Sequence, residues 1–184
     1  MIVFDTESTG LPGSALRRLS EQPWTIEIAA VKVDLVGDAD GPHVFETFHE
    51  LVKPGAPITA QITQITGITN EMVREAPPFS DVWPRFADFV RGETVWVAHN
   101  CAHDVRMLEL DLAREQAVTR FPWPTVHVCT VEHTKELPLV DRKLTTLYKY
   151  LFDEPLKQTH RALDDVAALA KVTSALVTRG VLHL

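Results

Sequence analysis

The chain has 184 residues, of which 45% are hydrophobic, and a formal net charge of −7 at pH 7. This length suits a single compact domain with a hydrophobic core, so we expect one domain over residues 1–184. No segment has the ~18 consecutive apolar residues of a membrane-spanning helix, so we expect no membrane partner. The negative charge argues against tight, non-specific binding of duplex nucleic acid, which a positive surface favours.

Targeting and cysteine patterns give one further expectation. No basic, apolar leader precedes the first strand-like run, so we expect no secretory signal. The two cysteines, Cys101 and Cys129, lack the spacing of a metal site and provide no disulfide framework. These features predict a protein of the reducing cytoplasm.

Three strand-like segments open the chain. Residues 1–5 form a short apolar run, residues 25–35 alternate between apolar and other side chains, and residues 43–54 follow after the turn-forming stretch GDADGP. Because a short turn joins the second segment to the third, we expect the three strands to form an antiparallel meander.

Helical and strand patterns then alternate to the end of the chain. We expect a short helix or turn over 58–69, a helix over 80–92, a strand over 95–98, a helix over 101–115, a strand over 125–129 and helices over 144–151 and 160–180. Pro84 fits its helix only within the first turn. The order predicts an α/β fold with a mixed five-stranded sheet, three strands in the meander and two parallel, and helices on both faces.

The first candidate site residues are Asp5 and Glu7, which end the opening strand. Residues two apart on a strand share a face, so both carboxylates can face one point if the strand continues through Thr6. Two neighbouring anions repel each other, whereas a divalent cation between them is attracted to both, and carboxylate oxygens suit Mg²⁺ or Mn²⁺. A solvated loop with chance acids is the alternative explanation.

A second acid, Asp104, follows the apolar strand VWVA in the stretch HNCAHD. Functional groups of sheet proteins gather at the carboxyl ends of such strands. An acid that interacts only with the N-terminus of a helix explains Asp104 equally well.

The stretch HRALDD, residues 160–165, contributes a histidine and two acids. Asp165 shares a helical stripe with Leu169, Val172 and Leu176, whereas Asp164 lies on a more polar face. We therefore expect Asp165 to face the site and Asp164 to face solvent. His160 can serve the same site only from the loop that precedes the helix.

Together, FDTESTG, VAHNCAHD and HRALDD resemble the three motifs of the DEDDh branch of the DnaQ-like 3'–5' exonucleases, whose fold is ribonuclease H-like. The segment ITGIT also resembles a loop of that family, and the resemblance covers nearly the whole chain. VWVAHN followed by an aspartate is most similar to exonuclease X and to the proofreading domains of replicative polymerases.

The resemblance implies a metal-dependent exonuclease that releases nucleoside 5'-monophosphates from the 3' ends of single-stranded DNA. It implies that Asp5 bridges two Mg²⁺ ions, for which Mn²⁺ can substitute, that Glu7 and Asp165 complete the first metal site and that Asp104 supports the second. His160 would act as the general base, because an imidazole with a pKa near ~6.5 accepts a proton from water at neutral pH.

The resemblance also implies a set of residues that contact the substrate strand. In relatives, the loop that Thr9, Gly10 and Leu11 match holds the terminal nucleotide, with the leucine against its base, and the ITGIT segment flanks the same base. A plain turn or a helix stop explains the glycines equally well. The expected substrate-binding residues are Thr6, Ser8, Thr9, Gly10, Leu11, Thr66, Ile68, His99 and Asn100.

Other functions and partners stay open at this level. RNA in place of DNA fits the same motifs, because contacts to the 2'-OH depend on pocket geometry. A catalytically silent docking module fits less well, since all five site residues are present, and an aspartyl phosphatase would give His160 no role. The partner could be a polymerase, a helicase or a CRISPR-adaptation protein, and the oligomeric state is open.

Overall fold

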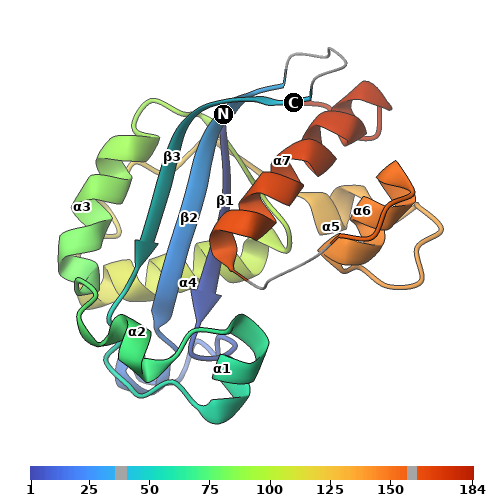
Figure 1. The fold of residues 1–184 in the computed structure, drawn as a ribbon. Helices are drawn as coiled ribbons and strands as arrows, with labels where there is room; N and C mark the ends of the chain where they lie inside the picture. Colours follow the sequence, from blue (N-terminus) through green and yellow to red (C-terminus); the bar gives the residue numbers. More distant parts are fainter. Residues whose placement is uncertain (36–40, 157–160) are drawn as a thin grey trace.

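The computed structural model describes residues 1–35, 41–156 and 161–184. One five-stranded sheet with the order β3-β2-β1-β4-β5 runs through it (Figure 1). The strands are β1 (Ile2–Ser8), β2 (Thr25–Asp34), β3 (His43–Leu51), β4 (Val95–Ala98) and β5 (Val126–Cys129). β1, β2 and β3 pair antiparallel, whereas β4 pairs parallel with both β1 and β5. The predicted ribonuclease H-like sheet is therefore confirmed.

Helices cover both faces of this sheet. In chain order they are α1 (Ala60–Thr66), α2 (Asn70–Arg74), α3 (Phe79–Val90), α4 (Cys101–Arg114), α5 (Thr130–His133), α6 (Leu144–Phe152) and α7 (Ala162–Thr178), with a 3-10 turn, η1, over Leu19–Glu21. The sequence did not predict α2, α5 or η1, which are too short to show a period. None of the helices in this part of the chain has the length and apolarity that crossing a membrane requires.

Two apolar clusters fix the layers of the fold. On one face, Phe4 and Trp96 of the sheet pack against α3 and α4, for example at Phe86 and Leu108. On the other face, residues such as Val3 pack against α6 and α7. Alternate residues of each strand supply the two clusters, so neighbouring side chains of β1 project to opposite sides of the sheet.

Two local expectations met different outcomes. Gly67 ends α1 in the left-handed region at φ 71°, as the punctuation of that segment predicts. Pro84 lies at the sixth residue of α3, beyond the first turn, so the expectation that confined it to that turn is wrong. α3 begins at Phe79, one residue earlier than the pattern predicts, with Pro78 at the cap position.

The long segment between β1 and β2 is fastened to the rest of the fold at its base. Thr9 N–H donates to the Trp24 carbonyl (2.9 Å), and Trp24 N–H donates to Thr9 Oγ1 (2.9 Å). Arg114 of α4 donates to the carbonyls of residues 19, 22 and 23, pairs with the buried Asp111, and lies 3.8 Å over the Trp24 ring. The position of residues 9–11 relative to the sheet thus depends on α4.

We expect Arg114→Met to lower the free energy of unfolding by about 3 kcal/mol, because the buried Asp111 carboxylate loses its positively charged partner, keeping only the bond from Thr25 N–H, and the loop carbonyls lose the guanidinium donor. For a chain of this size, that loss corresponds to a fall in Tm of roughly 6–12 °C. Thermal denaturation measures it. Arg91→Met, which breaks the exposed pair with Asp88, is the matched control and should change Tm by less than about 2 °C.

Candidate active site

Two carboxylates lie on the face of β1 that looks toward α7. The strand continues through Thr6 to Ser8, so Asp5 and Glu7 share a face with Val3, as the spacing predicts. Val3 belongs to the apolar cluster beneath α7. The two acids are therefore fixed by the middle strand of the sheet, and the alternative of a solvated loop does not hold.

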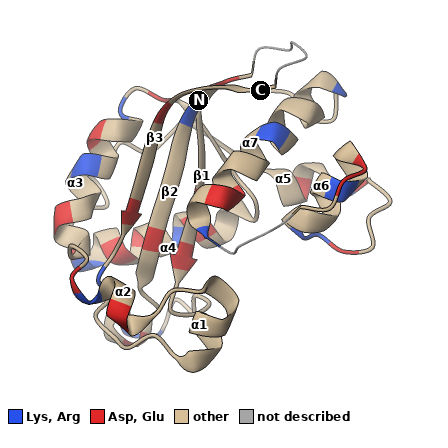
Figure 2. Cartoon of the chain, in the orientation of Figure 1, with Lys and Arg blue, Asp and Glu red and all other residues tan. Residues whose placement is uncertain are grey.

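Asp165 joins them from α7. It lies in the first turn of the helix with a buried side chain, while Asp164 beside it is exposed, which confirms the predicted orientation of both residues. Oxygen atoms of Asp5, Glu7 and Asp165 all lie within 4.8 Å of one another. Figure 2 shows acidic residues at the end of β1 and at the adjoining start of α7.

Burial and mutual repulsion make this group electrostatically unfavourable by itself. Burial raises the pKa of Asp5 well above its ordinary value, and the charges of neighbouring acids raise it further. Burial and the charge of Asp165 raise the pKa of Glu7 to about 8. A divalent cation would remove the repulsion, and a set of carboxylate oxygens suits Mg²⁺ or Mn²⁺. The three side chains therefore fit a divalent metal ion.

Asp104 lies beside this group but is not a member of it. Its buried carboxylate, in the first turn of α4, accepts hydrogen bonds at Oδ1 from Thr6 N (3.0 Å) and Thr6 Oγ1 (2.8 Å). Burial raises the pKa of Asp104 to about 7 despite these donors. Thr6 was expected to contact substrate; in the structure its side chain is buried and holds Asp104, and the substrate contact stays a prediction.

His160 lies outside the described residues, which resume at Arg161. Arg161 and the N–H of Ala162 both bind Glu27, a buried residue of β2 that the sequence analysis missed. The signal was present, because Glu27 is a charge on the strand face that otherwise carries Ala29 and Val31. Glu27 is paired with Glu7 across β1 and β2, so it lies beside the carboxylate group.

A cavity of about 600 Å³ opens next to Glu7. Four expected substrate-binding residues, Ser8, Thr9, Gly10 and Leu11, line one side, and residues of α1 and its flanks, including Thr66, line the other. Leu11 is 83% exposed, so its side chain is free to contact a ligand.

Three other expected substrate-binding residues do not line this cavity. The Ile68 side chain is fully buried in a cluster with Ile26 and Val73 and so packs in the core, and its expected contact with a base stays a prediction. His99 has both ring nitrogens engaged, Nδ1 with Thr130 Oγ1 (2.8 Å) and Nε2 with the Arg142 carbonyl (2.7 Å), which gives it a structural role. Asn100 precedes α4 in the left-handed region at φ 68°.

His103 also lines the cavity, and the sequence analysis did not single it out. Burial lowers the pKa of its imidazole, which favours the neutral form. Its position directly before Asp104 in the second motif was the available signal. The ring therefore adds a polar, aromatic surface to a cavity that is otherwise lined by the Glu7 carboxylate and by hydroxyl, amide and aliphatic groups.

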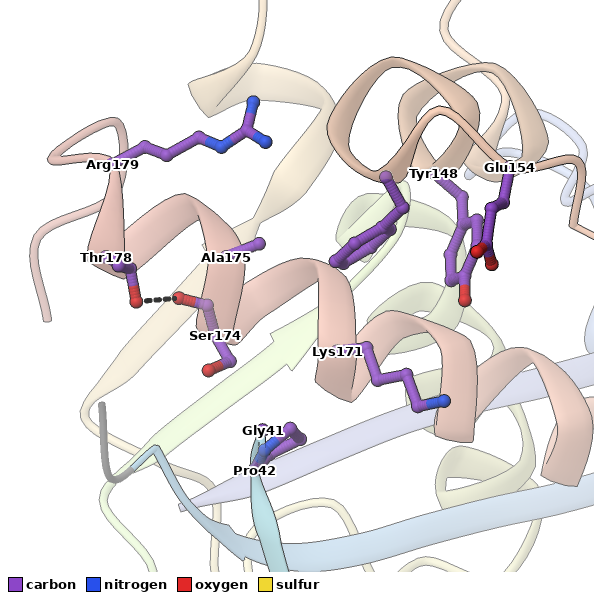
Figure 3. Close-up of a pocket in the computed structure, with 10 residues that line it drawn as sticks. Gly41, Pro42, Tyr148, Glu154, Lys171, Ser174, Ala175, Thr178 and Arg179 are labelled. Atoms are coloured by element: carbon purple, nitrogen blue, oxygen red, sulfur yellow. Dashed lines mark hydrogen bonds between the residues drawn. The ribbon is translucent and has the colours of Figure 1, made fainter. Parts of the chain in front are cut away.

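A second cavity, of about 450 Å³, lies between α6, α7 and residues 41–42 (Figure 3). Tyr148, Glu154, Lys171 and Arg179 line it, as Figure 3 shows. The guanidinium of Arg179 donates to the Leu151 carbonyl. None of the three clustered carboxylates lines this cavity, so it is separate from the candidate site.

Comparison with known proteins agrees with this geometry. The family model RNase_T, described as Exonuclease, matches residues 2–173. The DNA polymerase III PolC-type proteins of Caldanaerobacter subterraneus subsp. tengcongensis and Bacillus subtilis are 34% and 32% identical over 93% and 92% of this chain, which spans 11% of each polymerase. A Mycobacterium tuberculosis protein named as a bifunctional exonuclease/endonuclease is 37% identical over 97% of this chain and 26% of its own length.

Solved structures share the fold. Exonuclease X in complex with 5' overhanging duplex DNA is 26% identical, with a TM-score of 0.65, and the match covers 97% of this chain and 92% of that chain. The nuclease domain of 3'hExo, a DEDDh family member, bound to rAMP, is 18% identical, with a TM-score of 0.73 and the same coverage. At 18% identity the second match shows the fold alone.

The raised pKa of Glu7 predicts how stability depends on pH. The pKa of Glu7 is 4.5 in the unfolded chain and about 8 in the folded protein. Between pH 4.5 and pH 8, the folded state therefore binds a proton more tightly than the unfolded state. The free energy of unfolding of the metal-free protein should therefore fall as pH rises from about 4.5 to about 8. In Glu7→Gln that fall should be smaller.

Thermal melts in EDTA should show Glu7→Gln more stable than the wild type at pH 8, by on the order of 1 kcal/mol or 2–4 °C. Added Mn²⁺ should raise the Tm of the wild type and have little effect on the variant, because the variant lacks one ligand. Glu136→Gln, an exposed charge removal away from the cluster, is the control. Equal melting curves for wild type and Glu7→Gln at pH 8 would contradict the raised pKa of Glu7.

Proposed function

This chain belongs to the RNase_T exonuclease family, and from that premise we propose that it is a metal-dependent 3'–5' exonuclease acting on single-stranded DNA ends. One observation carries the proposal. Oxygen atoms of Asp5, Glu7 and Asp165, from β1 and α7, converge within 4.8 Å beside a cavity of about 600 Å³. This arrangement places a cation site next to a space of the size that ligand pockets have, about 300–1,000 Å³.

The reaction is hydrolysis of the terminal phosphodiester. His160 takes a proton from a water molecule, and the water oxygen forms a bond to phosphorus while the bond from phosphorus to the 3' oxygen of the preceding nucleotide breaks. A proton is returned to that 3' oxygen. The products are a nucleoside 5'-monophosphate and a strand shortened by one nucleotide with a free 3'-OH.

We assign the metal to the three clustered carboxylates, with Mg²⁺ as the physiological ion and Mn²⁺ as its substitute. When bound, divalent cations neutralise the charge that builds on the attacking and leaving oxygens. In the two-ion form of the proposal, Asp104 would support the second site, partly through water. The bonds that its Oδ1 accepts from Thr6 hold this carboxylate beside Asp5.

The terminal nucleotide is assigned to the cavity beside Glu7. Leu11, Ile62 and Ile65 offer apolar surface against which a base can pack. A Cβ built at Gly10 would meet no atom within 4 Å, so the space beside this backbone is open. Because Gly10 has no side chain, the sugar can approach its backbone closely. His103 faces the same space and can contact the sugar or the base.

We further propose that the 3' ends on which the enzyme acts are those made by a DNA polymerase. This rests on relatives named as DNA polymerase III PolC-type, in which the matching segment is a small part of a longer chain. The 26% identical exonuclease X is described in complex with DNA, which favours DNA over RNA as the substrate.

Substitution of a clustered carboxylate tests the metal assignment. Asp5→Asn and Asp165→Asn should each lower kcat by on the order of 10³-fold, because a neutral amide cannot replace an anionic ligand of a divalent ion. The measurement is digestion of 5'-labelled oligonucleotides with and without Mg²⁺, read as a ladder of shortened products. Asp88→Asn, on the exposed face of α3, is the control and should retain full activity.

Matched single-stranded DNA, duplex, mismatched and RNA substrates complete that assay. Faster digestion of RNA than of DNA would transfer the proposal to an exoribonuclease. An intact 3' end after long incubation with Mg²⁺ and Mn²⁺ would favour a silent binding module. Near-normal turnover in Asp5→Asn would exclude the carboxylate cluster as the metal site.

His160→Ala tests the general base separately. We expect it to lose most turnover, by about 10²–10⁴-fold, while Mn²⁺ still raises the Tm, because an imidazole that accepts a proton contributes that much and is not a ligand here. The wild-type rate should rise with pH near the histidine pKa of ~6.5, and this limb should disappear in the variant. Loss of Mn²⁺ stabilisation in His160→Ala would assign the residue to the metal instead.

A further inference from the structure

Glu27 places a negative charge where the candidate site would be easier to form without one. Its side chain is fully buried in β2, directly across the strand pair from Glu7. Its charge contributes to raising the pKa values of both Asp5 and Glu7. A buried acid next to three others is unfavourable unless it makes specific contacts that a neutral residue would not make.

Those contacts join the sheet to the start of α7. Glu27 Oε1 accepts from Arg161 Nη2 (2.6 Å) and Nε (3.0 Å), and Glu27 Oε2 accepts from the N–H of Ala162 (2.8 Å). His49 Nε2 lies 2.8 Å from Glu27 Oε1. Burial would raise the pKa of Glu27, but the bonds from Arg161, His49 and Ala162 outweigh it and hold the pKa low.

The Ala162 bond makes Glu27 the N-terminal cap of α7. The residue at the cap position, Arg161, makes no capping hydrogen bond with its own side chain. A carboxylate that accepts from a free N–H in the first turn stabilises a helix end through both the hydrogen bond and the helix dipole. In this chain the capping group comes from another strand, so the cap also fixes where the helix begins relative to β2.

We propose that Glu27 is a positioning residue of the active site, and that its bonds to Arg161 and Ala162 hold the start of α7 beside Asp5 and Glu7. Asp165 lies in that same first turn. This inference rests on the function proposed above and names the interaction that places Asp165 beside the other two carboxylates.

Arg161 has the charge that makes this arrangement tolerable. Its guanidinium pairs with Glu27 through two donors and also lowers the pKa of Glu7. Glu27 raises the pKa of Arg161, so the pair stays ionised. Arg161 is thus bound to protein and balances part of the acidic charge.

Glu27→Gln and Arg161→Met test the proposal. Each should lower kcat by about 10–100-fold, leave KM for the oligonucleotide within about 3-fold, and raise the Mn²⁺ concentration at half-maximal stabilisation by at least 5-fold. Because the two residues act as one unit, the double variant should lose no more kcat than the more impaired of the two single variants. A residue that only supports the fold would lower Tm in EDTA without moving the Mn²⁺ midpoint.

Glu50 and Arg85 provide matched controls, because they form a pair at 2.7 Å between β3 and α3, away from the carboxylates. Glu50→Gln and Arg85→Met should leave kcat and the Mn²⁺ midpoint within 2-fold. Unchanged kcat and Mn²⁺ midpoint in Glu27→Gln, or additive losses in the double variant, would overturn the proposal. If Glu27→Gln fails to fold, Arg161→Met, whose side chain is 31% exposed, decides alone.

The two proposals fail in different ways. A wild-type protein without 3'-end activity contradicts the proposed function, yet the Mn²⁺ midpoints still measure whether Glu27 positions Asp165. An active wild type with unchanged Glu27 and Arg161 variants leaves the exonuclease in place and removes the positioning role.

Discussion

Repulsion among Asp5, Glu7 and Asp165 is the constraint on which the arrangement of the site depends. The three carboxylates lie within 4.8 Å of one another, and burial together with like charge raises the pKa values of Asp5 and Glu7. Folding alone does not favour such a group. The apolar contacts of α7 with the sheet hold it together, and a divalent cation then turns a destabilising feature into a binding site.

Two further buried acids beside the group are treated differently by the fold. Asp104 accepts two hydrogen bonds from Thr6, and Glu27 accepts several from Arg161 and Ala162. Each of them ties a helix to the sheet, α4 to β1 in the first case and α7 to β2 in the second. Asp104 and Glu27 therefore help to determine where Asp5, Glu7 and Asp165 lie. This explains why the fold tolerates so much negative charge at the end of β1.

The sequence predicted the sheet and the carboxylate group because both follow from period and order. Alternation placed Asp5 and Glu7 on one face, and the helical stripe placed Asp165 inward. The sequence could not show which motif residues are exposed to a ligand. Thr6 and Ile68 both lie in segments that resemble family motifs, but tertiary packing buries both side chains. The pairing of Glu27 with Arg161 was not predicted because the two residues are 134 positions apart, a separation that no local pattern records.

The distribution of cations explains how an acidic chain can act on a polyanion. Arg114, Arg142, Arg161 and Arg179 all donate to oxygen atoms of the protein itself, so their charges serve the fold. In the proposed function, the metal-loaded carboxylates and the partly apolar cavity would therefore supply part of the affinity for the strand. Without a cation the clustered carboxylates repel phosphate, whereas a bound cation would attract it. Metal occupancy would then control both substrate affinity and the chemical step of the proposed reaction.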